Sequence, residues 1–444
     1  MEQKEHIDFH PVTVADKPLF EYYILFSEEQ NCDLNFANIL CWSDTYHTEI
    51  AEVDNSLVIR FDNSGEKCYM QPFCIGDKSL IIERLRQDAF SQRVPLRLYG
   101  LSHEWRKFLE ENYPSEFAFD APRALCDYIY RTEDLAHLPG RKYQPKRNHI
   151  NNFIARNDWY VEPLSKANIK DCLTLNNKWL QGREVGEMER AEQRALHCAF
   201  DNFDVLGLQG LVLYANGAPV AFSYGTPITH KTFCVHIEKY DSEVQGAATM
   251  INRLMAQSLE GEFEFVNRED DLGLEGLRFA KMSYCPTLLL DKISALHLTA
   301  EQREMRAMWH EIFGDEIHEI DSFLITHNDA IPLIHKENGK VVSMLYIVPL
   351  QMVCKKVAYL YAVATKPEYR GRGIASKLLN EALQLIKDSG LFDMVALIPS
   401  STESKRLYER LGFEDRQMPM EFPPHDYLGT GSPNHDLAMV KVIK

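Results

Sequence analysis

The segment 363–375 constrains the fold more than any other part of the chain, because an apolar strand runs through a glycine-rich turn into an amphipathic helix. A helix start exposes about four unpaired N–H groups and roughly half a positive charge. Gly371 and Gly373 allow a ligand to approach the backbone closely, and Arg370 and Arg372 can bond phosphate oxygens. The segment therefore predicts a diphosphate-binding turn. The alternative is an ordinary strand–loop–helix junction.

Two familiar phosphate motifs do not fit this turn. The P-loop requires a Lys-Ser/Thr pair, and the dinucleotide fingerprint requires a third glycine. Arg370, Gly373 and Ala375 instead match the pattern Gln/Arg-x-x-Gly-x-Gly/Ala, which resembles motif A of the GCN5-related N-acetyltransferases (GNAT). This resemblance implies that acetyl-coenzyme A (acetyl-CoA) is bound. The coenzyme-binding residues that we infer are Val363, Ala364, Thr365, Arg370, Gly371, Arg372, Gly373, Ile374, Ala375, Ser401, Ser404 and Tyr408.

The residues that follow continue the same pattern. The helix has apolar positions at helical spacing and a stop signal at Gly390, and a strand is expected over 394–398. Ser400 and Glu403 predict a capping box that opens a further short helix. The sequence of 407–413, LYERLGF, resembles motif B of the same family. That resemblance makes Tyr408 the expected proton donor, and the alternative is a core aromatic residue.

The expected chemistry is direct attack of an amine on a thioester. A backbone N–H near Val363 or Ala364 would stabilise the charge on the carbonyl oxygen, and Tyr408 would protonate the departing sulfur. The base is not identified by spacing. Glu316, Glu319 and Asp321 are its candidates in the acidic segment 313–323, and solvated surface carboxylates are the alternative.

The composition limits the broad class of protein. The chain has 444 residues, enough for about three domains, and 45% hydrophobic residues, with neither a secretory signal nor a membrane span expected. Ten cysteines lack metal-ligand spacing, so we expect reduced thiols in the cytoplasm and no metal. A net charge of −17 disfavours broad nucleic-acid binding. The basic segment 141–147 leaves local contact with tRNA or phosphate as an alternative to a solvated linker.

Two further units are expected before the C-terminal one. Helices are predicted at 15–26, 78–92, 166–181 and 187–202, and strands at 56–61, 68–73, 208–214, 220–225 and 232–238. Asn216-Gly217 predicts a hairpin turn. Gly246 opens a strand–turn–helix corner that mimics the phosphate-binding turn but lacks its arginine and second glycine. We expect at best a degenerate phosphate site there.

Residues 8–293 carry a second resemblance. The sequences LPGRKY (138–143), KRNHIN (146–151), NREDDLG (267–273) and LRFAKMSY (277–284) resemble an uncharacterised bacterial family similar to the C-terminal domain of phosphatidylglycerol lysyltransferases. Those enzymes use tandem acetyltransferase-like folds to move an aminoacyl group from tRNA to a lipid. The resemblance suggests a second site, for which a salt-bridge network is the alternative. Its residues would be Asn267, Arg268, Glu269, Asp270, Arg278 and Lys281.

The sequence thus predicts an α/β (α+β) protein with three GNAT-like units, each a mixed, mostly antiparallel sheet flanked by helices. The units would be residues 1–140, not catalytic; 141–295, similar to the lysyltransferase domain; and 296–444, the GNAT domain. The predicted activity is transfer of an acetyl group from acetyl-CoA to an amine of a small molecule or peptide. The alternatives are an aminoacyl-tRNA-dependent transferase centred on 141–295 and a non-catalytic protein that binds coenzyme or metabolite.

Overall fold

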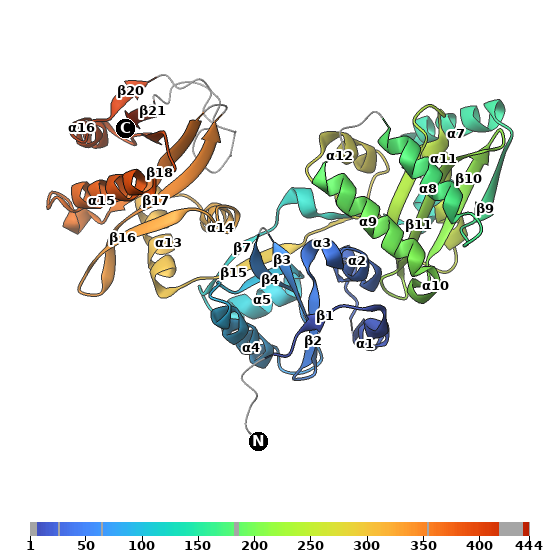
Figure 1. Ribbon diagram of the computed structural model, residues 1–444, viewed down its shortest axis with the longest axis horizontal. Helices are drawn as coiled ribbons and strands as arrows, with labels where there is room; N and C mark the ends of the chain where they lie inside the picture. Colours follow the sequence, from blue (N-terminus) through green and yellow to red (C-terminus); the bar gives the residue numbers. More distant parts are fainter. Residues whose placement is uncertain are drawn as a thin grey trace. The chain divides into compact units, whose positions relative to one another are not determined.

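The computed structural model describes residues 7–24, 27–63, 65–181, 186–352, 355–416 and 438–443. The chain divides into two compact units. Unit 1 combines residues 1–112 with 121–294, and unit 2 combines residues 113–120 with 295–444. The described strands form three sheets with helices around them (Figure 1). Each sheet mixes parallel and antiparallel pairs, so the expected fold class is confirmed.

The first sheet of unit 1 contains, in spatial order, β1 (His10–Pro11), β2 (Glu49–Val53), β3 (Ser56–Asn63), β4 (Glu66–Met70) and β6 (Arg97–Leu101), with β5 (Phe73–Cys74) paired to β3. β4 and β6 are parallel, and α4 (Lys78–Ser91) connects them along the chain. The other helices here are α1 (Lys17–Ile24), α2 (Phe36–Cys41), α3 (Ser43–Tyr46) and α5 (His103–Asn112). A short 3-10 turn, Cys32–Leu34, precedes α2.

The second sheet of unit 1 contains, in spatial order, β14 (Leu288–Leu290), β8 (Asp127–Arg131), β13 (Phe265–Asn267), β12 (Thr232–Tyr240), β11 (Ala218–Pro227), β10 (Gln209–Ala215) and β9 (Trp159–Pro163). Its helices are α6 (Thr132–His137), α7 (Gln144–Arg156), α8 (Ile169–Leu180), α9 (Glu187–Asp201), α10 (Phe203–Leu206), α11 (Ala247–Leu259) and α12 (Glu275–Met282). Asn216 and Gly217 both have positive φ between β10 and β11. The predicted hairpin is confirmed, because a two-residue turn of this kind needs positive φ at both positions.

Unit 1 has apolar cores on both faces of the second sheet. On one face, α7 and α11 supply Phe153, Met250 and Ile251. On the other face, α8 and α9 supply Leu175 and Leu196, in a cluster shared with Phe20, Leu57 and other residues of the first sheet. The two sheets of unit 1 therefore share a hydrophobic core.

Unit 2 begins with β7 (Phe117–Asp120) and β15 (Ile293–His297). The first two residues of β15 belong to unit 1. Its main sheet contains, in spatial order, β16 (Ile331–Glu337), β17 (Lys340–Met352), β18 (Lys355–Thr365), β19 (Met394–Leu397), β21 (Ala438–Val442) and β20 (Glu414–Arg416). Its helices are α13 (Ala300–Phe313), α14 (Ile317–Thr326), α15 (Ile374–Ser389) and α16 (Thr402–Arg410). Apart from β7, Figure 1 shows these elements in yellow to red.

Helices cover both faces of the main sheet in unit 2. The apolar stripe of α15, with Leu378, Leu379 and Ala382, packs in a cluster with Ala358 and Val395. A second cluster holds Met308 and Trp309 of α13, Phe323 of α14, and Tyr346 and Tyr359 of the sheet. The strand β18 therefore lies in a sheet packed between two helical layers.

Two predicted helix ends in unit 2 have different outcomes. Gly390 ends α15 in a left-handed conformation with φ 62°, so the predicted stop is confirmed. The predicted capping box of Ser400 and Glu403 is wrong by one position. Ser401 is the N-cap of α16, because its backbone is extended and its side chain accepts a hydrogen bond from the N–H of Ser404.

Within the described ranges, no helix is long and apolar enough to cross a membrane. The nine described cysteines are free, as expected for reduced thiols.

Candidate active site

The central feature of unit 2 is the divergence of β18 from β19. Among the described residues these parallel strands pair only over Val357–Tyr359 and Met394–Ala396. β18 then continues to Thr365 beside β17 alone, where Ser343 of β17 donates to the carbonyl of Ala364 at 2.8 Å. The second half of β18 therefore has one edge that is not paired to β19. Ser343 is a supporting residue that the sequence motifs did not indicate.

A β-bulge lies at this divergence. Tyr361 stands opposite Tyr346, and Ala364 stands opposite Met344, so two residues of β18 share one partner on β17. Ala362 has φ 49°, a left-handed conformation that non-glycine residues seldom adopt. Bulges redirect backbone groups and are frequent beside active sites. Val363, the residue expected to polarise the thioester, directly follows Ala362 within the bulge.

The predicted phosphate-binding turn lies at the end of β18, before the 16-residue helix α15. Gly371 has φ 76° and Gly373 has φ 77°, so both need the left-handed conformation that glycine adopts without strain. A Cβ added at either position would meet no atom within 4 Å. Both glycines therefore face open space beside the start of α15, where a phosphate-binding turn needs room for its ligand.

The two arginines of the turn already contact its backbone. Arg370 Nε donates to the carbonyl of Thr365 at 3.0 Å, and Arg372 donates to the carbonyl of Glu368 at 2.9 Å. Arg372 also lies 3.9 Å from the carboxylate of Glu337. Both arginines are exposed, and each guanidinium has about five N–H donors. They can stabilise the turn and still offer donors to a phosphate.

The remaining predicted coenzyme residues lie at α16. Ser401 is exposed and Ser404 is partly buried, and they bond each other as the N-cap and third residue of that helix. Tyr408 is buried with 5% exposure, and its ring meets Phe413 at 6.0 Å in an edge-on arrangement. Burial raises the pKa of Tyr408 to about 12, so its phenol is protonated at neutral pH.

Structural partners already occupy the three candidate bases. The carboxylate of Asp321 is buried against Arg306, with Nε and Oδ1 2.6 Å apart, and accepts from the N–H of Phe119. Glu316 and Glu319 form the capping box of α14. These contacts favour structural roles for all three carboxylates.

Aromatic rings gather beside the bulge. The ring of Tyr361 lies 5.2 Å from Trp309 and 5.2 Å from Phe323, and it remains partly exposed. Burial raises the pKa of Tyr361, and the nearby charges of Asp315 and Glu319 raise it further. A partly exposed tyrosine ring with carboxylates nearby therefore lies next to the predicted thioester position.

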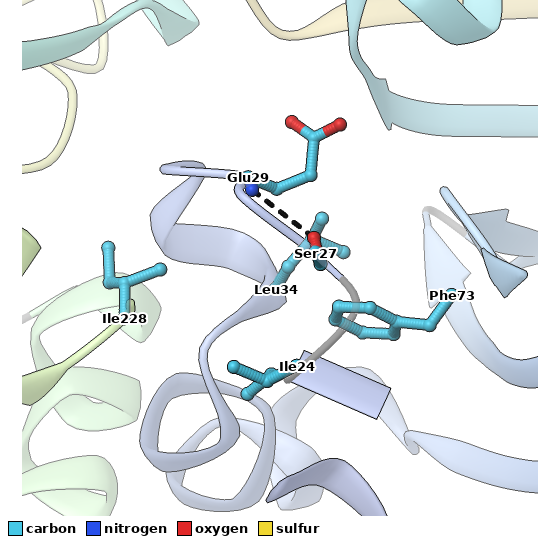
Figure 2. A pocket seen from close by; sticks show the side chains of 6 residues that line it. All are labelled: Ile24, Ser27, Glu29, Leu34, Phe73 and Ile228. Carbon is cyan, nitrogen blue, oxygen red and sulfur yellow. Dashed lines mark hydrogen bonds between the residues drawn. The ribbon is translucent and has the colours of Figure 1, made fainter. Parts of the chain in front are cut away.

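Two cavities lie away from the phosphate-binding turn. One, of about 410 Å³, is lined by Leu385, Ile386 and Ser389 near the C-terminal end of α15, whereas Gly373 lies at its N-terminal end. The other lies in unit 1 and is lined by Ile24, Ser27, Glu29, Leu34, Phe73 and Ile228. Figure 2 shows the carboxylate of Glu29 directed away from Ser27, whose hydroxyl accepts a hydrogen bond from the N–H of Glu29 at 3.2 Å. At about 10 Å³ this cavity holds at most one water molecule.

The mimic of the phosphate-binding turn in unit 1 is blocked. Gly246 precedes α11 with φ 89°, but a Cβ there would lie 2.6 Å from the carbonyl oxygen of His149 and 3.0 Å from Cβ of Phe153. The helix α7 therefore packs directly on this corner. The glycine serves close helix packing, which explains the strand–turn–helix pattern without a phosphate.

The predicted second-unit residues lie together around β13 and α12, but their polar side chains are bonded to other groups of the protein. Arg278 holds Asp271 through two bonds of 2.9 and 3.1 Å. The ammonium of Lys281 donates to the carbonyls of Arg268 and Asp270. Asn267 is fully buried and donates to the carboxylate of Asp127 at 2.8 Å. Its neighbours Arg268 and Glu269 contact Glu238 and His236 of β12 instead.

Sequence motifs missed Lys292, which is 4% exposed and lies 3.0 Å from each of three carboxylates, those of Asp33, Asp127 and Asp270. Burial alone would lower the pKa of Lys292, but these carboxylates raise it well above its usual value. The cluster joins the Cys32–Leu34 turn, the start of β8 and the segments that follow β13 and β14. No local sequence pattern predicts this cluster, because its members are far apart in the sequence.

Buried polar atoms without described partners surround Glu238. Its carboxylate accepts from Arg268 at 3.0 Å and from Asn252 at 3.1 Å. One guanidinium nitrogen of Arg268 and the amide oxygen of Asn252 are buried, and neither has a hydrogen-bond partner among the described residues. Nearby, Lys146 lies 3.9 Å from the centre of the Tyr284 ring. Burial and the charge of Arg268 lower the pKa of Lys146 to about 8.

Comparison with known families defines the two parts of the chain. Residues 26–295, more than half of the chain, match the family described as phosphatidylglycerol lysyltransferase, C-terminal. The chain therefore belongs to this family. Residues 296–413 match the acetyltransferase (GNAT) family. Both predicted resemblances are confirmed, and the C-terminal part is a GNAT acyltransferase domain.

Known structures and sequences include similar proteins. A conserved protein of unknown function from Bacteroides thetaiotaomicron is 39% identical, with a TM-score of 0.63 over 66% of this chain and 100% of that chain. A GNAT family N-acetyltransferase from Escherichia coli in complex with CoA is 17% identical, with a TM-score of 0.25 over 33% of this chain and 78% of that chain. An uncharacterized protein of Mycoplasmoides gallisepticum is 21% identical over 201 residues. The chain spans 62% of that protein's length.

Proposed function

We propose that unit 2 transfers an acetyl group from acetyl-CoA directly to an amine of a small molecule or peptide. The main support is the open N-terminus of α15. Two left-handed glycines, Gly371 and Gly373, precede this helix without any atom that a Cβ would meet within 4 Å. The turn follows a bulged strand that diverges from its parallel neighbour. This combination leaves space and N–H donors for an anionic group at one end of an open strand edge.

In this proposal the residues from Arg370 to Ala375 bind the diphosphate of the coenzyme. Backbone N–H groups at the start of α15 carry most of the interaction, and the two arginines add charge-assisted bonds. The N–H of Val363 or Ala364, beside the bulge, polarises the thioester carbonyl. A donor placed where negative charge develops lowers the barrier by about 3 to 4 kcal/mol in comparable sites.

Tyr408 supplies a hydrogen bond to the departing sulfur. A thiol has a pKa of about 8.5, whereas that of Tyr408 is raised to about 12. Complete transfer of the proton would therefore be unfavourable by about 5 kcal/mol. The phenol stabilises the thiolate by donating a hydrogen bond, and any full protonation follows as the product leaves.

The residues beside the bulge support an amine as the acceptor substrate. Tyr361 offers a partly exposed aromatic ring beside the bulge, and Asp315 and Glu319 raise the pKa of Tyr361 by their charge. A cationic amine is attracted by both aromatic faces and carboxylates. Loss of its proton is left to water, because Glu316, Glu319 and Asp321 have structural partners.

The test is an incubation of the full chain with isotopically labelled acetyl-CoA and a metabolite extract, read by mass spectrometry for labelled amides and by thiol release. We expect at least one labelled amide that depends on the protein. Calorimetry with CoA is run in parallel. Absence of binding would refute the proposal, whereas tight binding without turnover across a broad amine panel would make unit 2 a coenzyme-binding module.

A second candidate function rests on unit 1. The buried atoms of Arg268 and Asn252 that lack described partners flank Glu238, so this site has both a donor and an acceptor to offer a ligand. We propose aminoacyl transfer from tRNA as the alternative activity, with Arg141, Lys142 and Lys146 near the nucleic acid. Filter binding with bulk tRNA tests it. Specific capture with a steep salt dependence would support it, and equal capture of a random RNA would oppose it.

A further inference from the structure

The point where β12 and β13 diverge in unit 1 holds an unusual trio of side chains. The parallel pairing of these strands ends at Cys234 and Asn267. β12 has a bulge at His236, and Glu269 lies two residues beyond the end of the pairing with φ 57°. The sulfur of Cys234, one ring nitrogen of His236 and one carboxylate oxygen of Glu269 all lie within 4.8 Å of one another.

The hydrogen bonds around His236 determine which ring nitrogen carries a proton. The amide nitrogen of Asn35 donates to the carbonyl of Pro227 at 2.9 Å, and its amide oxygen accepts from the N–H of Ala37 at 2.8 Å. That same oxygen lies 3.1 Å from the hydroxyl of Thr226, which must therefore donate to it. The hydroxyl of Thr226 then accepts from Nε2 of His236 at 2.8 Å. The ring proton of a neutral His236 is on Nε2.

Nδ1 of His236 consequently presents a lone pair, and it faces another acceptor. The distance from Nδ1 to Oε1 of Glu269 is 3.1 Å. Two lone pairs at this separation repel each other unless a positive species lies between them. That species is either a second ring proton or a metal ion.

We propose that Cys234, His236 and Glu269 bind a divalent transition-metal ion of the zinc class. The sulfur of Cys234 lies 3.6 Å from the same oxygen of Glu269. Ligands at tetrahedral zinc, with bonds of about 2.0 to 2.3 Å, lie about 3.4 to 3.6 Å apart. The two measured separations, 3.1 and 3.6 Å, are close to this geometry, and the sulfur and the ring nitrogen lie within 4.8 Å of each other.

The surroundings of the trio match those of known metal sites. A metal-bound histidine commonly donates its other N–H to a protein oxygen, as Nε2 of His236 does to Thr226. The carboxylate of Glu269 also accepts a bond of 2.9 Å from the side-chain amide of Asn38, which orients it. A second ring proton would also satisfy His236 and Glu269, with the thiol of Cys234 donating weakly to Oε1 of Glu269 at 3.6 Å. A metal ion differs from this arrangement in needing the thiolate of Cys234 as a ligand, which is the feature that a spectroscopic test can detect.

Access to the site is through Glu269. Cys234 is fully buried and the side chain of His236 is 7% exposed, whereas that of Glu269 is 29% exposed. Three protein ligands leave a fourth tetrahedral position, which is the arrangement of zinc sites that accept water or substrate. We expect the fourth ligand to be an oxygen that enters from the exposed edge of Glu269.

Cobalt(II) is the probe for this site, because its visible bands report tetrahedral geometry and a near-ultraviolet charge-transfer band reports a thiolate ligand. The metal-stripped full chain is titrated with Co²⁺. We expect one equivalent to bind with both kinds of band, and one equivalent of Zn²⁺ to abolish them. In Cys234→Ser the charge-transfer band should be lost. Cys172→Ser, which changes another fully buried thiol in unit 1, should retain it.

Glu269→Gln and His236→Gln keep the size of each side chain and provide a second measure. Each should weaken Co²⁺ binding at least tenfold while the circular dichroism spectrum of the chain is unchanged. The inference is overturned if the wild-type chain gives no tetrahedral Co²⁺ spectrum, which would place a second proton on His236. It is also overturned if the charge-transfer band persists in Cys234→Ser. Should Cys234→Ser fail to fold, the wild-type spectrum and the two glutamine variants still decide the question.

Discussion

Replacing Gly373 by alanine tests whether the phosphate-binding turn of unit 2 binds the coenzyme. Gly373 has φ 77° and ψ 4° as the N-cap of α15. Alanine in this left-handed conformation costs about 1 to 2 kcal/mol, and no clash is added because the new Cβ meets nothing within 4 Å. We therefore expect a modest loss of stability. For a unit of this size it corresponds to a fall in Tm of about 2 to 4 °C per kcal/mol.

Gly314 provides a matched control in the same unit. It ends α13 with φ 79° and ψ 7°, and a Cβ there also meets nothing within 4 Å. Gly314→Ala should therefore lose about the same stability as Gly373→Ala. Any difference in coenzyme affinity between the two variants then reports the position of the methyl group, because the backbone strain is matched.

Calorimetry with CoA should show at least a tenfold loss of affinity in Gly373→Ala, about 1.4 kcal/mol, and none in Gly314→Ala. Pantetheine, which lacks the diphosphate, should bind both variants equally. Equal affinity of the two variants for CoA would refute the phosphate-binding role of this turn. A parallel loss for pantetheine would place the effect outside the diphosphate-binding turn.

Three further measurements test single side chains. Tyr408→Phe should lower turnover at least about tenfold with unchanged CoA affinity, measured by thiol release and calorimetry, and unchanged turnover would leave Tyr408 as a core aromatic. Because the pKa of Lys146 is lowered to about 8, competitive acylation of this lysine should be half-maximal near pH 8, well before Lys405, whose pKa the bond to Asp415 raises. The folded pKa lies below the unfolded value of 10.5, so the contribution of Lys146 to stability should rise from about pH 8 to 10.5. Identical pH profiles for the two lysines would contradict both statements. Lys292→Met, which leaves Asp127 buried without its cation, should lower the free energy of unfolding of unit 1 by about 3 to 5 kcal/mol in urea, and a loss under about 1 kcal/mol would contradict the role of the cluster.

Local sequence patterns were sufficient to predict the backbone conformation where the residues that determine it follow one another in the chain. The turn at 370–375, the stop at Gly390 and the hairpin at Asn216-Gly217 each depend on the backbone preferences of a few neighbouring residues. The cap of α16 was misplaced by one residue, because four serines and threonines at 400–404 offer almost equivalent N-caps. Sequence alone does not determine which of them has the extended backbone that a cap requires.

Contacts between distant residues could not be predicted in this way. Lys292 meets carboxylates from positions 33, 127 and 270. Cys234 and His236 meet Glu269 only because two parallel strands end together. A search for metal-ligand spacing therefore gave no signal for this trio. The bulges at Ala362 and His236 were likewise invisible, because they depend on the register with a neighbouring strand.

The two glycine corners illustrate how one sequence pattern can have different physical causes. Gly246 and Gly373 both stand in the left-handed conformation between a strand and a helix. At Gly246 a methyl group would strike the backbone of α7, so the residue permits helix packing. At Gly373 a methyl group would enter open space, so packing gives no reason for the glycine there. Both glycines adopt the left-handed backbone conformation, and only the second corner has open space where a ligand could approach the start of the helix.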